Sequence, residues 1–223
     1  MLSSLSWIIP NCFGKLVGTR LFRYNLIDIR KMKYFWLSFN DQEIETVAYA
    51  PEGTPLSHKL VSEVCDREIM PFALELHKVM IETELSIGPV SSKHYDYQAN
   101  SLAWPLMSDS LREIIDSNLT GKEDLKWIKA NVVGELDTIF LYNIPLFHSY
   151  LETLDLKQSI IIPASGMVIK PVFSLDKVRH YSVFHGHSPF WKISSKFYVN
   201  EAIKESIIQN GLTGISFSEI AIS

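Results

Sequence analysis

The sequence predicts an α+β fold, with a mainly antiparallel sheet and a few helices packed on it. Short runs of alternating apolar and other residues predict strands, and longer runs with apolar residues three or four positions apart predict helices. Two pairs of strand-like runs are joined by turn-forming stretches, as in antiparallel hairpins. Of the 223 residues, 47% are hydrophobic and 21% are charged, which is typical of a folded chain with a sizeable core.

The first predicted elements are two strands and a turn. In residues 35–39 three apolar side chains alternate with Trp36 and Ser38, which predicts a strand. Residues 46–49 are β-prone and predict a second strand. Residues 51–55 contain two prolines and a glycine, which predicts a turn.

Residues 57–84 predict two consecutive helices, with Pro71 in the first turn of the second, where proline is tolerated. The outer face of these helices is acidic, so it is either a solvated surface or a docking surface for a basic partner. The partner-binding candidates on this face are Glu63, Glu75 and Glu82. Residues 86–100 predict a loop, in which the His-x-Asp pattern of His94 and Asp96 is typical of a local hydrogen-bonding turn.

The central part of the chain predicts a helix followed by hairpins. Residues 108–118 have helical spacing, and Ser110 and Glu113 have the spacing of a capping box. Strand pairs are predicted at 127–133 with 138–144 and at 160–162 with 168–173.

The C-terminal part predicts a strand, a helix and a second strand. Residues 197–199 are β-prone, Asn200 can cap a helix, and Gly211 occupies the position at which a left-handed residue ends one. Residues 215–217 have the alternation of a half-buried strand. The helix-then-strand units at 108–133 and 200–217 share this order, as an internal duplication would.

Charge is divided unevenly along the chain. Residues 1–31 carry five basic residues and one acidic residue, a formal charge of +4, whereas residues 32–223 carry 16 basic and 24 acidic residues, a formal charge of −8. We therefore divide the chain into a basic N-terminal extension, residues 1–31, and one folded domain, residues 32–223. We expect the extension to be disordered or to precede the true start at Met32. A basic, partly apolar arm could alternatively touch an anionic membrane surface.

Cellular location is predicted from segments that the sequence lacks. No run of about 18 apolar residues is present, so we expect no stable membrane insertion. In residues 1–31 the apolar run precedes the charges, which is the reverse of a secretory signal. Cys12 and Cys65 form no paired motif, as is usual in a reducing compartment, and we expect Cys65 to be a small buried hydrophobe.

A late loop carries two histidines and two aromatic residues that are suited to either chemistry or binding. Two imidazoles separated by one residue can share a metal ion, so a small hydrolase or other metal-dependent enzyme is one hypothesis. No further ligand follows at a suitable spacing, and aromatic residues also anchor protein interfaces. We therefore expect no metal and no cofactor. The partner-binding candidates in this loop are His185, His187, Phe190 and Trp191.

Sequence motifs for several other functions are absent. The chain has no Gly-x-Ser-x-Gly elbow, no His-Glu-x-x-His motif, and no glycine-rich loop that would bind phosphates or a dinucleotide. The acidic balance of residues 32–223 disfavours nucleic-acid binding, because affinity for phosphates comes from clustered lysine and arginine. The same charge is suited to contact with a basic protein surface.

Three segments occur in a recognisable order. The first is Pro105-Leu106-Met107-Ser108, which precedes a predicted helix, and the second is Tyr142-Asn143-Ile144, which precedes an Asp-x-x-x-Ser turn at Asp155. The third is Phe197-Tyr198-Val199-Asn200-Glu201, which is followed by a predicted helix and then by Gly211-Leu212-Thr213-Gly214-Ile215-Ser216-Phe217. Together they resemble a family of bacterial immunity proteins from polymorphic toxin systems. The resemblance covers residues 102–222, extends more loosely to residues 32–55, and does not include residues 56–97. It implies a cytoplasmic, non-enzymatic protein that binds and neutralises one cognate toxin domain.

Overall fold

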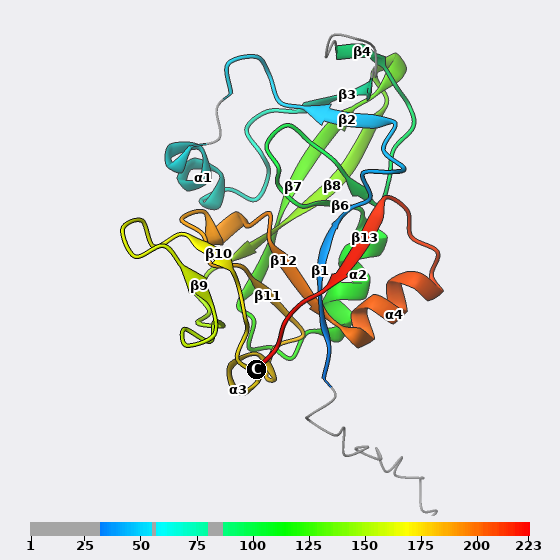
Figure 1. The fold of residues 1–223 in the computed structure, drawn as a ribbon. Helices are drawn as coiled ribbons and strands as arrows, with labels where there is room; N and C mark the ends of the chain where they lie inside the picture. The colour runs from blue at the N-terminus through cyan, green and yellow to red at the C-terminus, as the bar shows by residue number, and fades with distance from the viewer. Residues whose placement is uncertain (1–31, 55–56, 80–86) are drawn as a thin grey trace, which may run out of the picture.

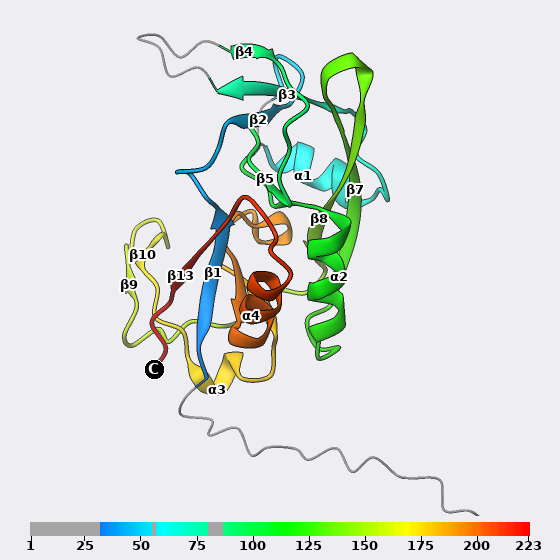
Figure 2. The same cartoon turned by 90° about the vertical axis from the view of Figure 1, so that its right-hand side faces the viewer.

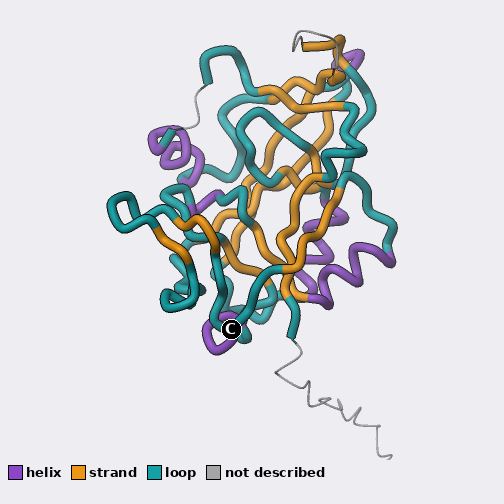
Figure 3. Tube along the Cα trace, in the orientation of Figure 1, coloured by secondary structure: helices purple, strands orange, loops and turns teal. Residues whose placement is uncertain are grey.

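The computed structural model describes residues 32–54, 57–79 and 87–223, so the predictions for residues 1–31 and Glu82 lie outside the described residues. Within them, the strands form a four-stranded, a seven-stranded and a two-stranded sheet, mostly antiparallel, and there are four α-helices. The predicted α+β class is confirmed. In Figure 3 the strands run through the middle of the molecule and the helices lie at its sides.

The four-stranded sheet is antiparallel and has the strand order β11-β12-β1-β13. Its strands are β1 (Tyr34–Phe39), β11 (Val183–His185), β12 (Phe197–Asn200) and β13 (Ile215–Glu219). In this register Trp36 lies between Tyr198 of β12 and Ser218 of β13. The strands predicted at 35–39, 197–199 and 215–217 are therefore confirmed.

The seven-stranded sheet has the order β2-β3-β7-β8-β6-β5, and β4 pairs with β3. Its strands are β2 (Thr46–Tyr49), β3 (Leu74–Val79), β4 (Ile87–Val90), β5 (Tyr97–Gln98), β6 (Leu106–Met107), β7 (Leu125–Val133) and β8 (Ile139–Phe147). Strands β7 and β8 form the predicted hairpin, which runs from the pair Leu125 and Phe147 to the pair Val133 and Ile139. A 3-10 turn, η2 (Glu135–Asp137), connects them.

The remaining elements surround these two sheets. The helices are α1 (His58–Cys65), α2 (Asp109–Asn118), α3 (Leu175–Val178) and α4 (Glu201–Gln209). Strands β9 (Ile160–Ile161) and β10 (Val168–Lys170) form the second predicted hairpin, which stands at the side of the molecule in Figure 1. A short 3-10 turn, η3 (Trp191–Ile193), lies between β11 and β12.

The prediction of a second helix in residues 57–84 is wrong, because residues 74–79 form β3. Leu74 and Leu76 are buried on either side of the exposed Glu75, which is the two-residue period of a strand. Strands β2, β4 and β7 pair with β3 and satisfy its backbone. Residues 86–100 were predicted as a loop, yet they include β4 and β5.

The two longest helices begin at side-chain caps. The hydroxyl of Ser108 accepts a hydrogen bond from Leu111 N at 3.2 Å, so Ser108 is the N-cap of α2 and the predicted capping box at Ser110 is wrong. The prediction for α4 is confirmed, because Asn200 Oδ1 accepts from Ile203 N at 3.0 Å. Gly211, just after α4, has φ +65° as expected.

The strands and helices repeat one arrangement. Strands β6 and β7 are both antiparallel to β8, which lies between them, and α2 connects them. Strands β12 and β13 are likewise both antiparallel to β1, and α4 connects them. In α2 the buried residues are Leu111 and Ile115, and in α4 they are Ile203 and Ile207. The two residues of each pair follow the N-cap of their helix at the same positions along the sequence. The two predicted helix-then-strand units therefore share a split β-α-β topology, and Figure 2 shows their helices side by side.

Two hydrophobic cores hold these layers together. One core contains α2, α4, the four-stranded sheet and one face of the seven-stranded sheet, where Met107 and Phe147 point. The other lies on the opposite face, where Leu106 and Leu146 pack with α1 and η3. Cys65 is half-buried against this second core, so it is less buried than expected. The seven-stranded sheet is consequently covered on both faces.

Candidate functional site

The loop between β11 and β12, residues 186–196, carries three of the predicted binding residues, His187, Phe190 and Trp191, and begins directly after a fourth, His185. Gly186 N donates a hydrogen bond to Lys196 O at 2.8 Å, which closes the base of the loop. Within it, Phe190 N donates to Ser188 Oγ at 3.0 Å. Ile193 is buried in the core beside α1. The loop is therefore fastened by its own hydrogen bonds and by an apolar anchor.

Aromatic rings gather on this loop around Tyr150, which follows β8. The centroid of the Tyr150 ring lies 5.7 Å from that of Trp191 and 5.9 Å from that of His187, with edge-to-face geometry in both pairs. The Tyr150 hydroxyl also hydrogen-bonds His187 Nδ1. Tyr150 and His187 are exposed and Trp191 is half-buried, so these three side chains form a partly exposed aromatic surface.

Phe190 extends the same loop toward α1. Its ring stacks on that of His58, the first residue of α1, with centroids 4.5 Å apart. Glu63 is exposed on the same helix. Of the acidic candidates, Glu63 therefore lies on an element that packs beside the aromatic loop. Glu75 lies instead on β3, where its carboxylate is 3.2 Å from His77 Nε2.

His185 is fully buried, so it supports the loop from below and is not available to contact a partner. Its Nε2 accepts a hydrogen bond from Leu151 N at 3.0 Å, and its Nδ1 faces Gly186 O at 2.9 Å. This pairing requires the neutral ring with its proton on Nδ1. Burial lowers the pKa of His185, an effect that the hydrogen bond to Gly186 only partly offsets. Both nitrogens are thus engaged by the backbone, and this geometry does not favour the alternative hypothesis of a metal ion shared by His185 and His187.

Asp96 belongs to the segment that was predicted to be a hydrogen-bonding turn. Its Oδ1 accepts from Ser108 Oγ at 2.7 Å, and its Oδ2 accepts from Thr213 N at 2.8 Å. Ser108 caps α2, and Thr213 follows α4, so one carboxylate joins both helical units. His94, in the same segment, stacks on Phe140. These contacts give the segment a structural role.

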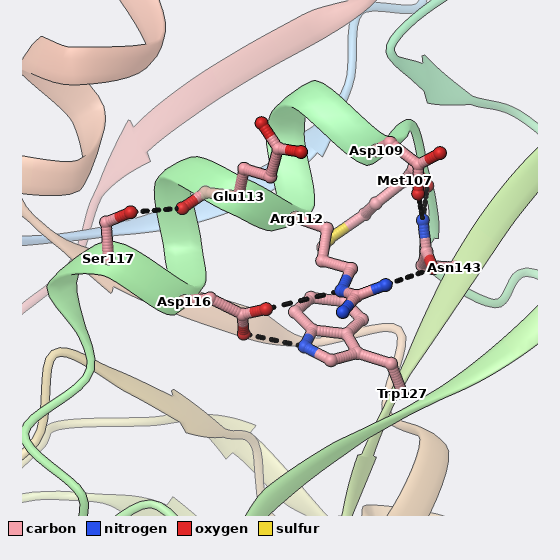
Figure 4. Close-up of polar contacts among 8 residues, drawn as sticks. All are labelled: Met107, Asp109, Arg112, Glu113, Asp116, Ser117, Trp127 and Asn143. Atoms are coloured by element: carbon pink, nitrogen blue, oxygen red, sulfur yellow. Dashed lines mark hydrogen bonds and ion pairs between the residues drawn. The ribbon is translucent and has the colours of Figure 1, made fainter.

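A polar cluster joins α2 to the hairpin of β7 and β8, as Figure 4 shows. The side chain of Asn143 is buried, and its Nδ2 donates to Asp109 Oδ1 at 2.9 Å. Arg112 donates to Asn143 Oδ1 at 3.3 Å and to Asp116 Oδ2 at 3.2 Å. Asp116 also accepts from Trp127 Nε1 at 2.7 Å. Because the members of the cluster bind one another, the cluster fastens the helix to the hairpin.

Sequence reasoning missed Tyr150 and His58. Neither residue belongs to a motif, and each reaches the loop from a distant part of the chain. The sequence carried no signal for either residue, since Tyr150 stands in the mixed stretch Phe147-His148-Ser149-Tyr150-Leu151.

Metal-binding clusters and membrane-spanning helices are both absent from the described residues. Across residues 32–54, 57–79 and 87–223, no three His, Cys, Asp or Glu side chains gather closely enough to hold a metal ion. Over the same ranges, no helix has the length and apolar character needed to cross a membrane.

In comparisons with known proteins, no protein-family model matches the sequence, and no curated protein shows significant similarity to it. The assignment of a function therefore depends on the sequence resemblance and on the geometry of the aromatic surface.

Proposed function

We propose that this protein is a cytoplasmic, non-enzymatic immunity protein that binds a cognate toxin domain and blocks it. The observation that carries the proposal is the partly exposed aromatic surface of Tyr150, His187 and Trp191 on a loop held by hydrogen bonds. Aromatic side chains on a rigid scaffold are typical anchors of protein interfaces. The resemblance of residues 102–222 to immunity proteins supplies the class of partner.

Charge favours a basic partner. Residues 32–223 carry a formal charge of −8, from 16 basic and 24 acidic residues. An acidic protein attracts a basic surface over a distance of about 10 Å at moderate salt, which accelerates association more than it strengthens the final complex. Glu63, exposed on α1 beside the aromatic loop, is the acidic candidate placed to contribute.

The proposal is tested by co-expressing the full chain with the C-terminal domain of a toxin encoded beside it. We expect growth to be rescued and a stoichiometric complex to co-purify. Trp191→Ala should weaken the complex about 30-fold, as expected for an aromatic hot spot worth about 2 kcal/mol. Tyr150→Ser, at a more exposed position, tests the same surface with less risk to folding.

Leu136→Ala is the matched control, because Leu136 is 94% exposed at the turn between β7 and β8. It should leave both rescue and affinity unchanged. Failure of the wild-type chain to bind or rescue would contradict the immunity function for that pair. Rescue that survives both Trp191→Ala and Tyr150→Ser would preserve the function and refute the aromatic surface as its site.

A further inference from the structure

A pocket of about 520 Å³ lies on the outer face of the four-stranded sheet. Trp36 of β1, Tyr198 of β12 and Ser218 of β13 are register partners and form its floor. The neighbouring residues Phe35 and Phe217 point to the other face, where Lys204 of α4 lies over both rings. Because side chains alternate along a strand, the pocket is on the face opposite α4. Its volume is that of a small-ligand site.

The wall of the pocket is apolar. The hairpin of β9 and β10 and the segments around it supply this wall, which is formed by Leu154, Val168, Ile169, Pro171 and Phe173. Ile169 is 60% exposed although it is a large aliphatic residue. Contact with an apolar ligand would remove this surface from water, which is favourable.

Lys196 supplies a positive charge at the edge of the pocket. Its Nζ lies 3.4 Å from the centroid of the Trp36 ring, and Trp36 is held by a hydrogen bond from Nε1 to Ser195 O. No carboxylate in the described part of the chain lies within ion-pair distance of Lys196. Glu219, which also lines the pocket, pairs with Lys33 at 3.2 Å. Loss of solvation lowers the pKa of Lys196, so an anion beside it would offset an existing cost.

His187 is a second polar group in the lining. Its Nδ1 is engaged by the Tyr150 hydroxyl. When Tyr150 donates this hydrogen bond, the proton of the neutral imidazole is on Nε2, which can then donate to a ligand. Gly186, beside it, allows the close approach of Lys196, because a Cβ at Gly186 would lie 2.6 Å from Lys196 Cβ.

We propose that this pocket binds a small organic anion with an apolar body. The apolar body lies on Tyr198 against the Ile169 wall, and the anionic group lies beside His187 and the Lys196 ammonium that covers Trp36. His187 belongs both to this pocket and to the partly exposed aromatic surface, whereas Lys196 and the apolar wall are not members of that surface. Ligand binding can therefore be measured without a toxin, and its outcome is separate from that of the immunity function.

Titration calorimetry of the full chain with decanoate tests the proposal, with decanol and decyltrimethylammonium as neutral and cationic ligands of equal chain length. We expect saturable binding of decanoate and at least about tenfold weaker binding of the other two, since neither presents an anionic group to Lys196. Lys196→Met keeps the apolar stem but removes the charge, so it should weaken decanoate binding about tenfold.

Matched controls separate the pocket from the general surface. Lys192→Met changes another exposed lysine, whose Nζ lies near the Trp191 ring. Neither Lys192 nor Trp191 lines the pocket. Ile169→Asn removes part of the apolar wall, whereas Ile208→Asn changes a similarly exposed isoleucine on α4. We expect Lys196→Met and Ile169→Asn to weaken binding and both controls to leave it unchanged. Absence of saturable decanoate binding, or equal effects of the pocket and control variants, would overturn the proposal.

Discussion

Single side chains hold the molecule together where distant segments meet. Glu123 is 1% exposed, and its carboxylate accepts hydrogen bonds from Ser182 N at 2.7 Å, Lys122 N at 2.9 Å, and the amide and hydroxyl of Thr120. Burial raises the pKa of Glu123, but these hydrogen bonds outweigh it and leave the pKa below its usual value. A buried anion is thus stabilised by donors in place of a cation.

Replacing Glu123 with glutamine should destabilise the protein at neutral pH by about 1–3 kcal/mol. The NH₂ group of glutamine would face the hydrogen-bond donors that now surround the carboxylate, so some of these donors would lose their acceptor. The folded pKa is lowered, so the carboxylate's stabilisation is complete above the unfolded pKa of about 4.3 and is lost as the pH falls through the folded value. Urea unfolding at pH 7 and pH 4 measures this difference: the free energy of unfolding should fall less between pH 7 and pH 4 in Glu123→Gln than in wild type. An equal loss in both would contradict this assignment. Glu135→Gln, at an exposed turn, is the control.

Gly214 and Gly211 both have positive φ, but only Gly214 lies against other atoms. A Cβ at Gly214 would be 2.5 Å from Tyr95 Cβ and 2.8 Å from Tyr97 O, whereas nothing lies within 4 Å of a Cβ at Gly211. Both alanine variants should incur the left-handed penalty of about 1–2 kcal/mol. In urea unfolding, Gly214→Ala should lower the free energy of unfolding by about 1–3 kcal/mol more than Gly211→Ala does, because it adds a steric clash. Equal losses would show that the backbone conformation alone requires glycine at both positions.

Helices α2 and α4 each begin at a side-chain cap at the end of a strand. Strand β6 leads into α2 through Ser108, and β12 leads into α4 through Asn200. In each case the cap satisfies an amide at the start of the helix that has no partner within it. Ser108 also donates to Asp96, which joins the start of α2 to the segment after α4.

Ser108→Ala should therefore lower the free energy of unfolding by about 1 kcal/mol or more, since it removes a cap. Ser110→Ala should change it by less than about 0.5 kcal/mol, because Ser110 is exposed within the helix. Thermal or urea unfolding of the two variants distinguishes them. A larger effect at Ser110 would restore the capping box that the sequence pattern predicted.

The two sheets are joined through α2 and α4, which pack on one another in a shared core. Leu111 and Ile115 of α2 and Ile203 and Ile207 of α4 are all buried there. A change in this layer acts on both sheets, because the helices are their common contact. The described residues should accordingly unfold as a cooperative unit.

Ile207→Ala should lower the free energy of unfolding by about 2–5 kcal/mol, because it leaves a cavity in the shared core. Native-state amide exchange should show the same loss of protection at Val199 in β12 and at Ala130 in β7. Ile208→Ala is the control, since Ile208 is 58% exposed on the same helix. A loss confined to β12 would show that the sheets unfold separately.

The amino-acid sequence was sufficient for elements whose stabilising contacts are local. The cap at Asn200 and the left-handed Gly211 depend on neighbours a few residues away, and the hairpin of β7 and β8 pairs two consecutive strands across a short turn. All three were predicted correctly. Strand β3 was mistaken for a helix because its pairing partners β2, β4 and β7 include distant segments. Tertiary contacts also separate His185 from His187: the first is buried against the Leu151 amide, and the second is exposed beside Tyr150. Sequence spacing treats the two imidazoles alike, whereas burial and hydrogen-bond partners depend on which segments the fold brings together.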